Sequence, residues 1–147
     1  MEHILDLPVQ EKQELNYAGF WIRFVAVFID GILLVIFQLL LGYVMYGGLS
    51  FSNRNLSHTI ISNLISLVYI VAMMGSSHQA TLGKMAVGIK VGNSDGSRIS
   101  YGQAIGRYIA TLLSTIVLLI GYLMVVWDKQ KQSLHDKLAN TYVFYEK

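Results

Sequence analysis

The chain contains no cysteine among its 147 residues, and this absence excludes several kinds of chemistry. Without a thiol there is no disulfide framework, cysteine nucleophile, thiolate zinc site or iron–sulfur cluster. The four histidines are scattered singly and form no metal-binding motif: His3, His58, His78 and His135. We therefore expect neither a metal nor a cofactor.

Charged residues are also scarce, at 14% of the chain, and the net charge is only +2. No basic cluster with interleaved aromatics is present, so we expect no nucleic-acid partner. The motifs of hydrolases and metalloproteases are missing, and Gly83–Lys84 lacks the hydroxyl residue that completes a phosphate loop. A two-carboxylate site made by Asp30 and Asp136 stays open, but nothing names a substrate for it. We predict that the protein is not an enzyme.

Apolar residues, in contrast, make up 54% of the chain, which is typical of a membrane protein rather than of a soluble domain. Residues 1–19 form a polar tail in which four acidic residues face a single lysine. No positively charged region therefore precedes the first apolar run, as it would in a cleaved signal peptide. We expect this run to be retained as a membrane span.

Three hydrophobic segments follow the tail, at about residues 20–46, 59–75 and 108–127. The first is long enough to cross a bilayer, because a spanning helix needs only about 20 largely apolar residues. The second carries a polar stripe at helical spacing, made of Thr59, Ser62, Asn63 and Ser66. The stripe predicts either hydrogen bonds between spans, which we favour, or the lining of a pathway.

Two charges interrupt the first segment, Arg23 in its first turn and Asp30 seven residues later. At about 100° per residue they return to nearly the same face of a helix, about 10 Å apart along its axis, too far for direct contact. Arg23 can extend to the headgroups, whereas an aspartate inside the hydrocarbon costs about 3 kcal/mol and marks a functional site by default.

The stretch 76–107 between the second and third segments is polar and rich in glycine, so we place it outside the hydrocarbon. Leucine, methionine, alanine and isoleucine recur at helical spacing from Leu82 to Ile89, which predicts a short amphipathic helix in the membrane interface. Residues 88–100 are predicted to form a small hairpin around a turn at 93–96.

The third segment poses a topological conflict. Four cations precede it after residue 76 and four follow it, so the positive-inside rule would place both of its flanks in the cytoplasm. A single crossing cannot do that. Either the segment is a bent or re-entrant hairpin hinged near Ser114 or Gly121, or it crosses and one flank breaks the rule.

These patterns predict an all-α membrane protein, a small bundle of about three hydrophobic helical segments with an interfacial segment and a short hairpin between the second and third. A single membrane domain is expected over residues 20–143, with tails at 1–19 and 144–147. Residues 128–147 are predicted to form a polar helix followed by a short extended stretch.

Four stretches resemble one family, the RDD family of membrane proteins. They are GFWIRFVAVFID at 19–30, QATLGKMAVGIKV at 79–91, YGQAIGRYIA at 101–110 and QSLHDKLANTYV at 132–143. The family takes its name from one arginine and two aspartates. The resemblance implies that these are Arg23, Asp30 and Asp136, with Asp128 as the other candidate for the second aspartate.

The resemblance also implies a small multi-pass protein of the cytoplasmic (inner) membrane concerned with transport, since a few relatives look like cation/proton antiporters. Asp30 would then exchange a proton for a small cation such as Na⁺, with its charge set by burial and by a nearby cation, Arg23 or Arg107. Asp136 would be a second acceptor or a gate partner. His135 would relay protons or, as we favour, be an ordinary exposed histidine. In the competing interpretation the three charges form a structural network.

The expected partners follow from size. Three short segments enclose little volume, so a transport path predicts a homo-oligomer in the lipid bilayer. The alternative function is an accessory or immunity-type membrane protein that binds and regulates another membrane protein, with segment 79–107 as its docking surface.

Overall fold

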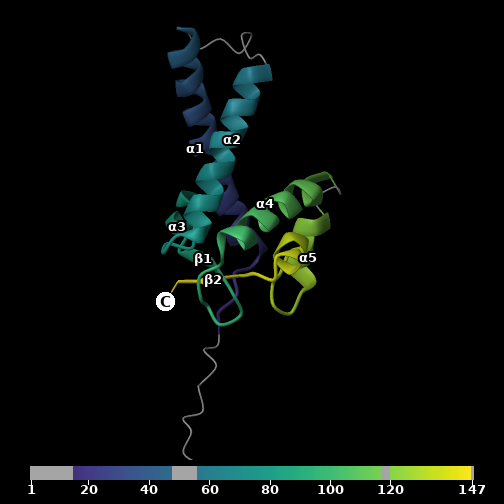
Figure 1. The fold of residues 1–147 in the computed structure, drawn as a ribbon. Coiled ribbons are helices and arrows are strands. Elements are labelled where there is room, and N and C mark those ends of the chain that lie inside the picture. The colour runs from purple at the N-terminus through teal and green to yellow at the C-terminus, as the bar shows by residue number, and fades with distance from the viewer. Residues whose placement is uncertain (1–14, 48–55, 117–119, 147) are drawn as a thin grey trace, which may run out of the picture.

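The computed structural model describes residues 15–47, 56–116 and 120–146. Two long helices, α1 (Phe20–Tyr46) and α2 (Leu56–Gly75), run side by side. The rest of the described chain lies at one end of this pair (Figure 1). Among the described residues, these are the two helices long and apolar enough to cross a membrane. At about 1.5 Å per residue, α1 is roughly 40 Å long and α2 roughly 30 Å. The hydrocarbon core is about 30 Å thick, so α1 extends beyond it.

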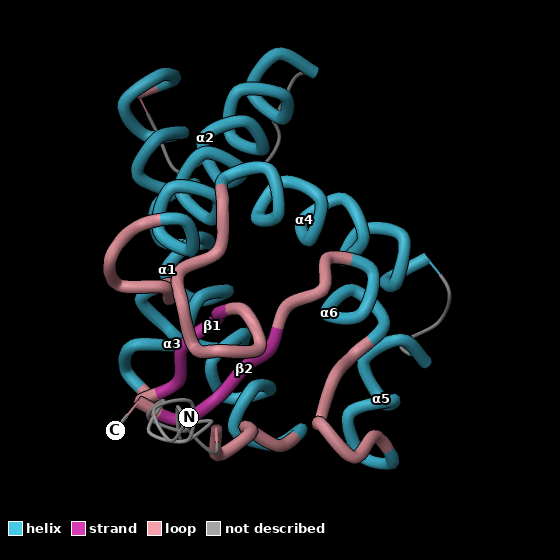
Figure 2. Tube along the Cα trace, turned by 60° about the horizontal axis from the view of Figure 1, so that its bottom comes forward, coloured by secondary structure: helices cyan, strands magenta, loops and turns pink. Residues whose placement is uncertain are grey.

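The polar base at the lower end of α1 and α2 contains all the other elements (Figures 1 and 2). In chain order these are α3 (Leu82–Ala86), β1 (Ile89–Gly92), α4 (Tyr101–Ile116), α5 (Ile120–Trp127), α6 (Leu134–Leu138) and β2 (Tyr142–Tyr145). The two strands pair antiparallel, with Ile89 opposite Tyr145. The segment before α1 lies along the other edge of β2, because the Ala18 N–H donates to the Val143 carbonyl at 2.9 Å.

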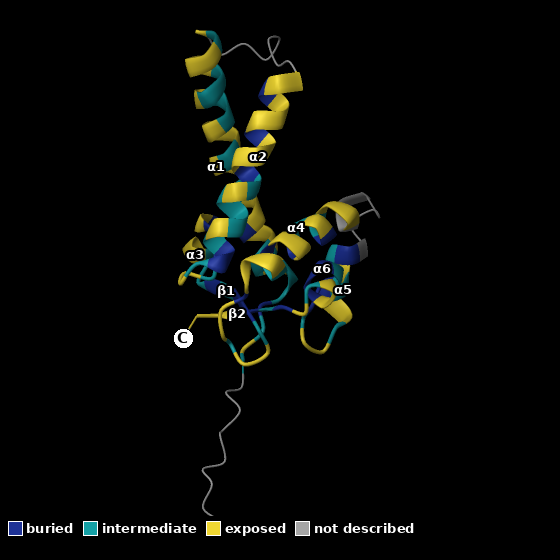
Figure 3. Ribbon diagram, viewed as in Figure 1, coloured by how far each residue is buried: buried dark blue, intermediate teal, exposed yellow. Residues whose placement is uncertain are grey.

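Buried residues are concentrated in this base, whereas α1 and α2 expose apolar side chains over most of their length (Figure 3). The core cluster joins the lower ends of the spans to the sheet and to α4: Ala18, Ala26, Met74, Ile89, Val91, Ile99, Ala104 and Val143. Of α1, only Ala26 is buried. The spans therefore present apolar surface suited to lipid, and the base is the part packed like a soluble protein.

The structure confirms an all-α membrane fold with a small sheet, and the first two hydrophobic segments are the two long helices. The short helix after residue 81, the turn at 93–96 and the C-terminal helix with an extended end are also present. The predicted hairpin over 88–100 is wrong, because β1 pairs with β2 near the end of the chain. Alternating apolar residues indicate a strand but do not identify its partner.

The third hydrophobic segment is two helices rather than one. α4 already begins at Tyr101, within the stretch predicted to be interfacial, and the described part of α5 begins at Ile120. In Figures 1 and 2, α4 runs sideways from the base of α2 and α5 folds back toward α6. The residues between them, 117–119, lie outside the described part of the chain.

Candidate functional site

Asp136 forms the centre of one charged cluster, in the polar base. It lies in α6, where a capping box holds it: the Ser133 hydroxyl accepts from the Asp136 N–H, and the Asp136 carboxylate accepts from the Ser133 N–H at 2.9 Å. Its side chain is fully buried. A buried carboxylate requires compensating charge, and here two arginines supply it.

Arg23 reaches the cluster from the first turn of α1. Its guanidinium forms an ion pair with Asp136 and also donates to the carbonyls of Lys131 and Ala18, the latter at 3.0 Å. The planar guanidinium suits such a site, because it offers several fixed donors to different acceptors. Arg23 therefore ties the start of the first span to α6 and the loop before it.

Arg107 reaches Asp136 from α4, and is 4% exposed. It forms an ion pair with the carboxylate and donates to the hydroxyl of Thr141, which is itself fully buried. Although burial alone would raise the pKa of the Asp136 carboxyl, the charges of Arg107 and Arg23 hold that pKa well below its ordinary value. Asp136 thus stays ionised and acts as a fixed charge that joins three helices.

His135 is buried in this cluster, with 6% of its surface exposed, so the expectation of an ordinary exposed histidine is wrong. Its ring packs against Tyr122, and its Nε2 lies 2.9 Å from the Ser133 hydroxyl. Burial, reinforced by the charge of Arg107, lowers the pKa of His135 to about 3. A histidine in this state is neutral at physiological pH and is unsuited to relay protons. The sequence missed its burial because its partner Tyr122 comes from another helix.

Asp30 belongs to a second, separate cluster between α1 and α3. Its carboxylate accepts hydrogen bonds from the Thr81 hydroxyl and from the Gly83 N–H, the latter at 2.8 Å. The Tyr69 hydroxyl, from α2, lies 3.3 Å from the same carboxylate and accepts from the Leu82 N–H at 3.0 Å. Asp30 therefore lies at the first turn of α3, where helix N–H groups need acceptors.

Gly83 makes this approach of α3 to α1 possible. A β-carbon at Gly83 would collide with the carbonyl oxygen of Ala26 and would lie 2.7 Å from the carboxyl carbon of Asp30. Such contacts are too short for any side chain, so the helix can lie against α1 only with glycine here. Sequence reasoning missed Tyr69, Thr81 and Gly83. The available signal was the threonine at the N-cap position of the predicted helix.

Lys84 is a further cation beside the Asp30 cluster that the sequence did not single out. Its half-buried side chain extends toward Met74, with the ammonium 3.8 Å from the sulfur. Burial, reinforced by the charge of Arg107, lowers the pKa of Lys84 to about 8. The lysine is therefore close to titrating in the physiological range.

The structure brings Arg23, Arg107, His135 and Asp136 together and places Asp30 elsewhere. Asp128 lies outside both clusters and pairs with Lys137 near the surface. In the polar stripe of α2, Ser62 and Ser66 are buried, but their hydroxyls bond to carbonyls of their own helix, whereas Asn63 is exposed. No group of three or more metal-ligating side chains occurs within the described residues.

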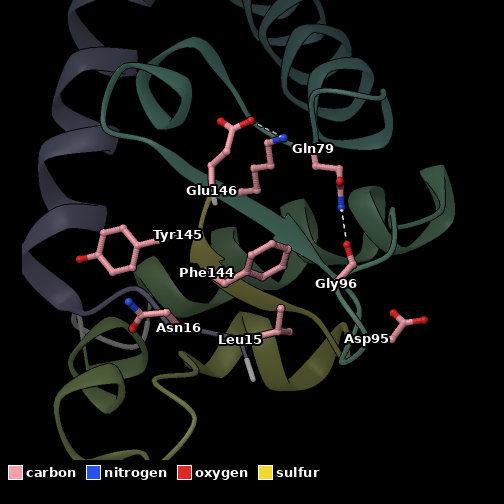
Figure 4. A pocket seen from close by; sticks show the side chains of 9 residues that line it. Leu15, Asn16, Gln79, Asp95, Gly96, Phe144, Tyr145 and Glu146 are labelled. Atoms are coloured by element: carbon pink, nitrogen blue, oxygen red, sulfur yellow. Dashed lines mark hydrogen bonds and ion pairs between the residues drawn. The ribbon is translucent and has the colours of Figure 1, made fainter. Parts of the chain in front are cut away.

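An open cleft of about 430 Å³ lies beside β2 and the 93–96 turn (Figure 4), and neither Asp30 nor Asp136 lines it. The Lys90–Glu146 ion pair crosses one side of it, and the Gln79 side chain donates to the Gly96 carbonyl at 3.2 Å. None of the residues that line the cleft belongs to the Asp30 or the Asp136 cluster, so the cleft adds no chemistry to the candidate site.

Comparison with known proteins finds one family and several relatives. The model of the RDD family matches residues 17–140. The uncharacterized protein YxaI of Bacillus subtilis (strain 168) is 36% identical over 88% of this chain and 97% of its own length. The uncharacterized membrane protein YteJ of the same strain is 30% identical over 94% of this chain and 88% of its own.

A shorter match is with the proline-rich antigen of Mycobacterium leprae (strain TN), which is 30% identical over 53% of this chain and 33% of its own length. No solved structure matches the chain significantly.

Proposed function

The chain belongs to the RDD family of membrane proteins, and from this premise we propose that it is a multi-pass protein of the cytoplasmic membrane that exchanges a monovalent cation for protons, with Asp30 as the coupling carboxylate. The observation that carries the proposal is the difference between the two aspartates. Asp136 is held by two arginines, whereas Asp30 accepts from a hydroxyl and a backbone N–H. A carboxylate without an arginine partner remains able to bind a cation or a proton.

The surroundings of Asp30 offer the ligands that a small hard cation requires. Carboxylate, hydroxyl and carbonyl oxygens are the preferred ligands of such ions. The hydroxyls of Thr81 and Tyr69 bond to Asp30, and the Ala26 carbonyl faces the same side of α3 through the contact with Gly83. Lys84, with its pKa of about 8, would gain or lose its positive charge beside this site as the pH changes.

Transport also requires a path, and two spans enclose too little volume to form one alone. The proposal therefore includes a homo-oligomer, in which copies of α1 and α2 surround the path. Crosslinking in membranes at native density should trap oligomers. A protein that stays monomeric under these conditions contradicts the transport mechanism.

The proposal is tested by proton movement in proteoliposomes loaded with a trapped pH dye and challenged with Na⁺, Li⁺ or K⁺. The wild type should give a cation-dependent pH jump that Asp30→Asn abolishes at matched incorporation. Asp95→Asn, which changes an exposed aspartate in the 93–96 turn, is the matched control and should leave the jump intact. The absence of a cation-dependent pH change with all three proteins would reject the exchange.

The apolar exposure of the spans favours a second candidate, an accessory protein that binds another membrane protein. Only Ala26 is buried along the whole of α1, and α3 adds exposed Leu82 and Met85 at its end of the span. In this case a partner should co-purify in fixed stoichiometry with wild type and Asp30→Asn alike. Replacing both Leu82 and Met85 by serine should release it without removing β1 from the core.

A further inference from the structure

The exposed face of α4 carries no charge. From residue 101 to residue 113, where the side chains are described, every buried or half-buried position, including Arg107, lies on one side of the helix, and α4 packs against α2 and α6. The positions on the outer face are all apolar, aromatic or glycine: Tyr101, Gly102, Ile105, Gly106, Ile109, Leu112 and Leu113. A helix face in water normally carries charged and polar residues, so this face is suited to another medium.

α5 repeats the pattern. Over residues 121–127, where the side chains are described, the exposed residues are Leu123, Val126 and Trp127, and the tryptophan is 74% exposed. Tryptophan is enriched at the boundary between acyl chains and headgroups, where its ring is apolar and its N–H is polar. The exposed faces of both helices therefore have the composition of lipid-facing surface.

The start of α4 lies at the level where the second span ends. The Tyr101 ring packs directly against Gly75, the last residue of α2. Because α2 is roughly as long as the hydrocarbon core is thick, Gly75 marks the boundary of that core when α2 crosses it. α4 leaves this point sideways (Figure 1), so its apolar face continues the apolar surface of α2 at the level of one leaflet.

Neither helix can cross the membrane alone. At about 1.5 Å per residue, α4 measures roughly 24 Å and the described part of α5 roughly 12 Å, against about 30 Å of hydrocarbon. The flanks of the pair both carry exposed cations, Arg98 before α4 and Lys129 after α5. Both flanks return to the polar base, where α4 and α5 each pack against α6.

We infer that α4 and α5 form a helical hairpin embedded in the single leaflet next to the polar base, with the acyl chains against its uncharged face and Arg98 and Lys129 at the headgroups. This arrangement satisfies the positive-inside rule on both flanks without a crossing. It does not depend on ion exchange, since it concerns how the base is attached to the membrane. The third hydrophobic segment is then an anchor that lies in the plane of the membrane, and it orients Arg107 toward Asp136.

The absence of cysteine makes the test direct, because single-cysteine variants need no background changes. Ser97→Cys and Lys129→Cys report the two flanks, and Met45→Cys reports the far end of α1. An impermeant maleimide applied to right-side-out and inverted vesicles should label the two flanks from the same side and Met45→Cys from the opposite side. Flanks labelled from opposite sides would mean that the segment crosses, and would overturn the inference.

Depth is measured on spin-labelled Ile109→Cys and Leu113→Cys in vesicles of phosphatidylcholine and phosphatidylglycerol. Collisions with oxygen should exceed collisions with a nickel chelate severalfold at both positions, and the order should reverse at Lys129→Cys. Nickel access at position 109 equal to that at position 129 would show a water-facing helix. Low access of both reagents would show that a protein, such as a second copy of the chain, covers the face. Either result overturns the inference.

Discussion

Arg23 and Asp136 lie 113 residues apart in the chain, and their side chains form a buried ion pair beneath the first turn of α1. Arg107 pairs with the other oxygen of the same carboxylate from α4. One aspartate therefore connects the long apolar helix α1 to two elements of the base. In this chain Arg23 and Asp136, two of the three residues that the family resemblance implies, thus form a single structural contact, whereas Asp30 belongs to a separate site.

Asp136→Asn should destabilise the fold severely. The substitution leaves two buried guanidinium groups without a counter-charge, and breaking a buried ion pair in this way costs about 3–5 kcal/mol. We expect a large fall in melting temperature in detergent, or failure to accumulate in the membrane. Asp128→Asn is the matched control, because Asp128 pairs with a half-exposed lysine at the surface, where such pairs contribute about 1 kcal/mol or less. Equal melting temperatures for the two variants would contradict this role of Asp136.

Tyr69→Phe should weaken the Asp30 cluster without unfolding the protein. The Tyr69 hydroxyl lies between the Asp30 carboxylate and the Leu82 N–H, and one intramolecular hydrogen bond contributes about 1 kcal/mol. We expect a small fall in melting temperature together with a higher cation concentration at half-maximal exchange. Tyr101→Phe, which alters an exposed tyrosine of α4, should change neither. An unchanged cation dependence in Tyr69→Phe would separate Tyr69 from the transport site.

The two long apolar helices, the short helix α3 and the C-terminal helix could be predicted from the sequence because each depends on local signals. Apolar length predicted α1 and α2, and spacing from Leu82 onward predicted α3. Local signals also singled out Arg23 and Asp30, as charges within an apolar segment. The family resemblance added Asp136, since no local pattern connects it to Arg23.

The remaining features depend on contacts between distant segments. β1 pairs with β2, whose residues lie 50 to 56 positions further along the chain, a choice that the alternating pattern of neither strand specifies. The sequence around His135 indicates a polar residue in a polar helix, and only the tertiary fold buries its ring against Tyr122. Asp30 faces Thr81 and Gly83 because α3 packs on α1. No local pattern in the sequence predicts that these two helices pack together.

Gly83→Ala should separate α3 from α1. Its methyl group would meet the Ala26 carbonyl and the Asp30 backbone nitrogen, the latter at 2.9 Å, so the helix must move and its bonds to Asp30 must break. We expect a loss of several degrees in melting temperature and loss of exchange. Gly106→Ala is the matched control, since its methyl group would meet nothing within 4 Å and alanine favours a helix by about 1 kcal/mol. Equal melting temperatures for Gly83→Ala and Gly106→Ala would contradict the close approach of α3 to α1 at Gly83.

Stability should decline as pH falls from about 6.5, because of His135. Burial holds the pKa of this histidine to about 3 in the folded protein, against an ordinary value of 6.5. Between these values the unfolded chain binds a proton that the folded chain does not. The free energy of unfolding therefore falls with decreasing pH, by at most about 1.4 kcal/mol per pH unit. The loss ends near pH 3, where the histidine is protonated in both states.

The range from pH 6.5 to pH 5 isolates this effect, because the Asp136 carboxyl has its pKa lowered and its unfolded form titrates only near pH 4. His135→Gln should flatten the dependence of melting temperature on pH in this range, whatever its stability at pH 7.5. His78→Gln, which changes an exposed histidine, should retain the wild-type slope. Parallel slopes in wild type and His135→Gln would mean that His135 accepts a proton within the fold, and would return it to the set of candidate proton carriers.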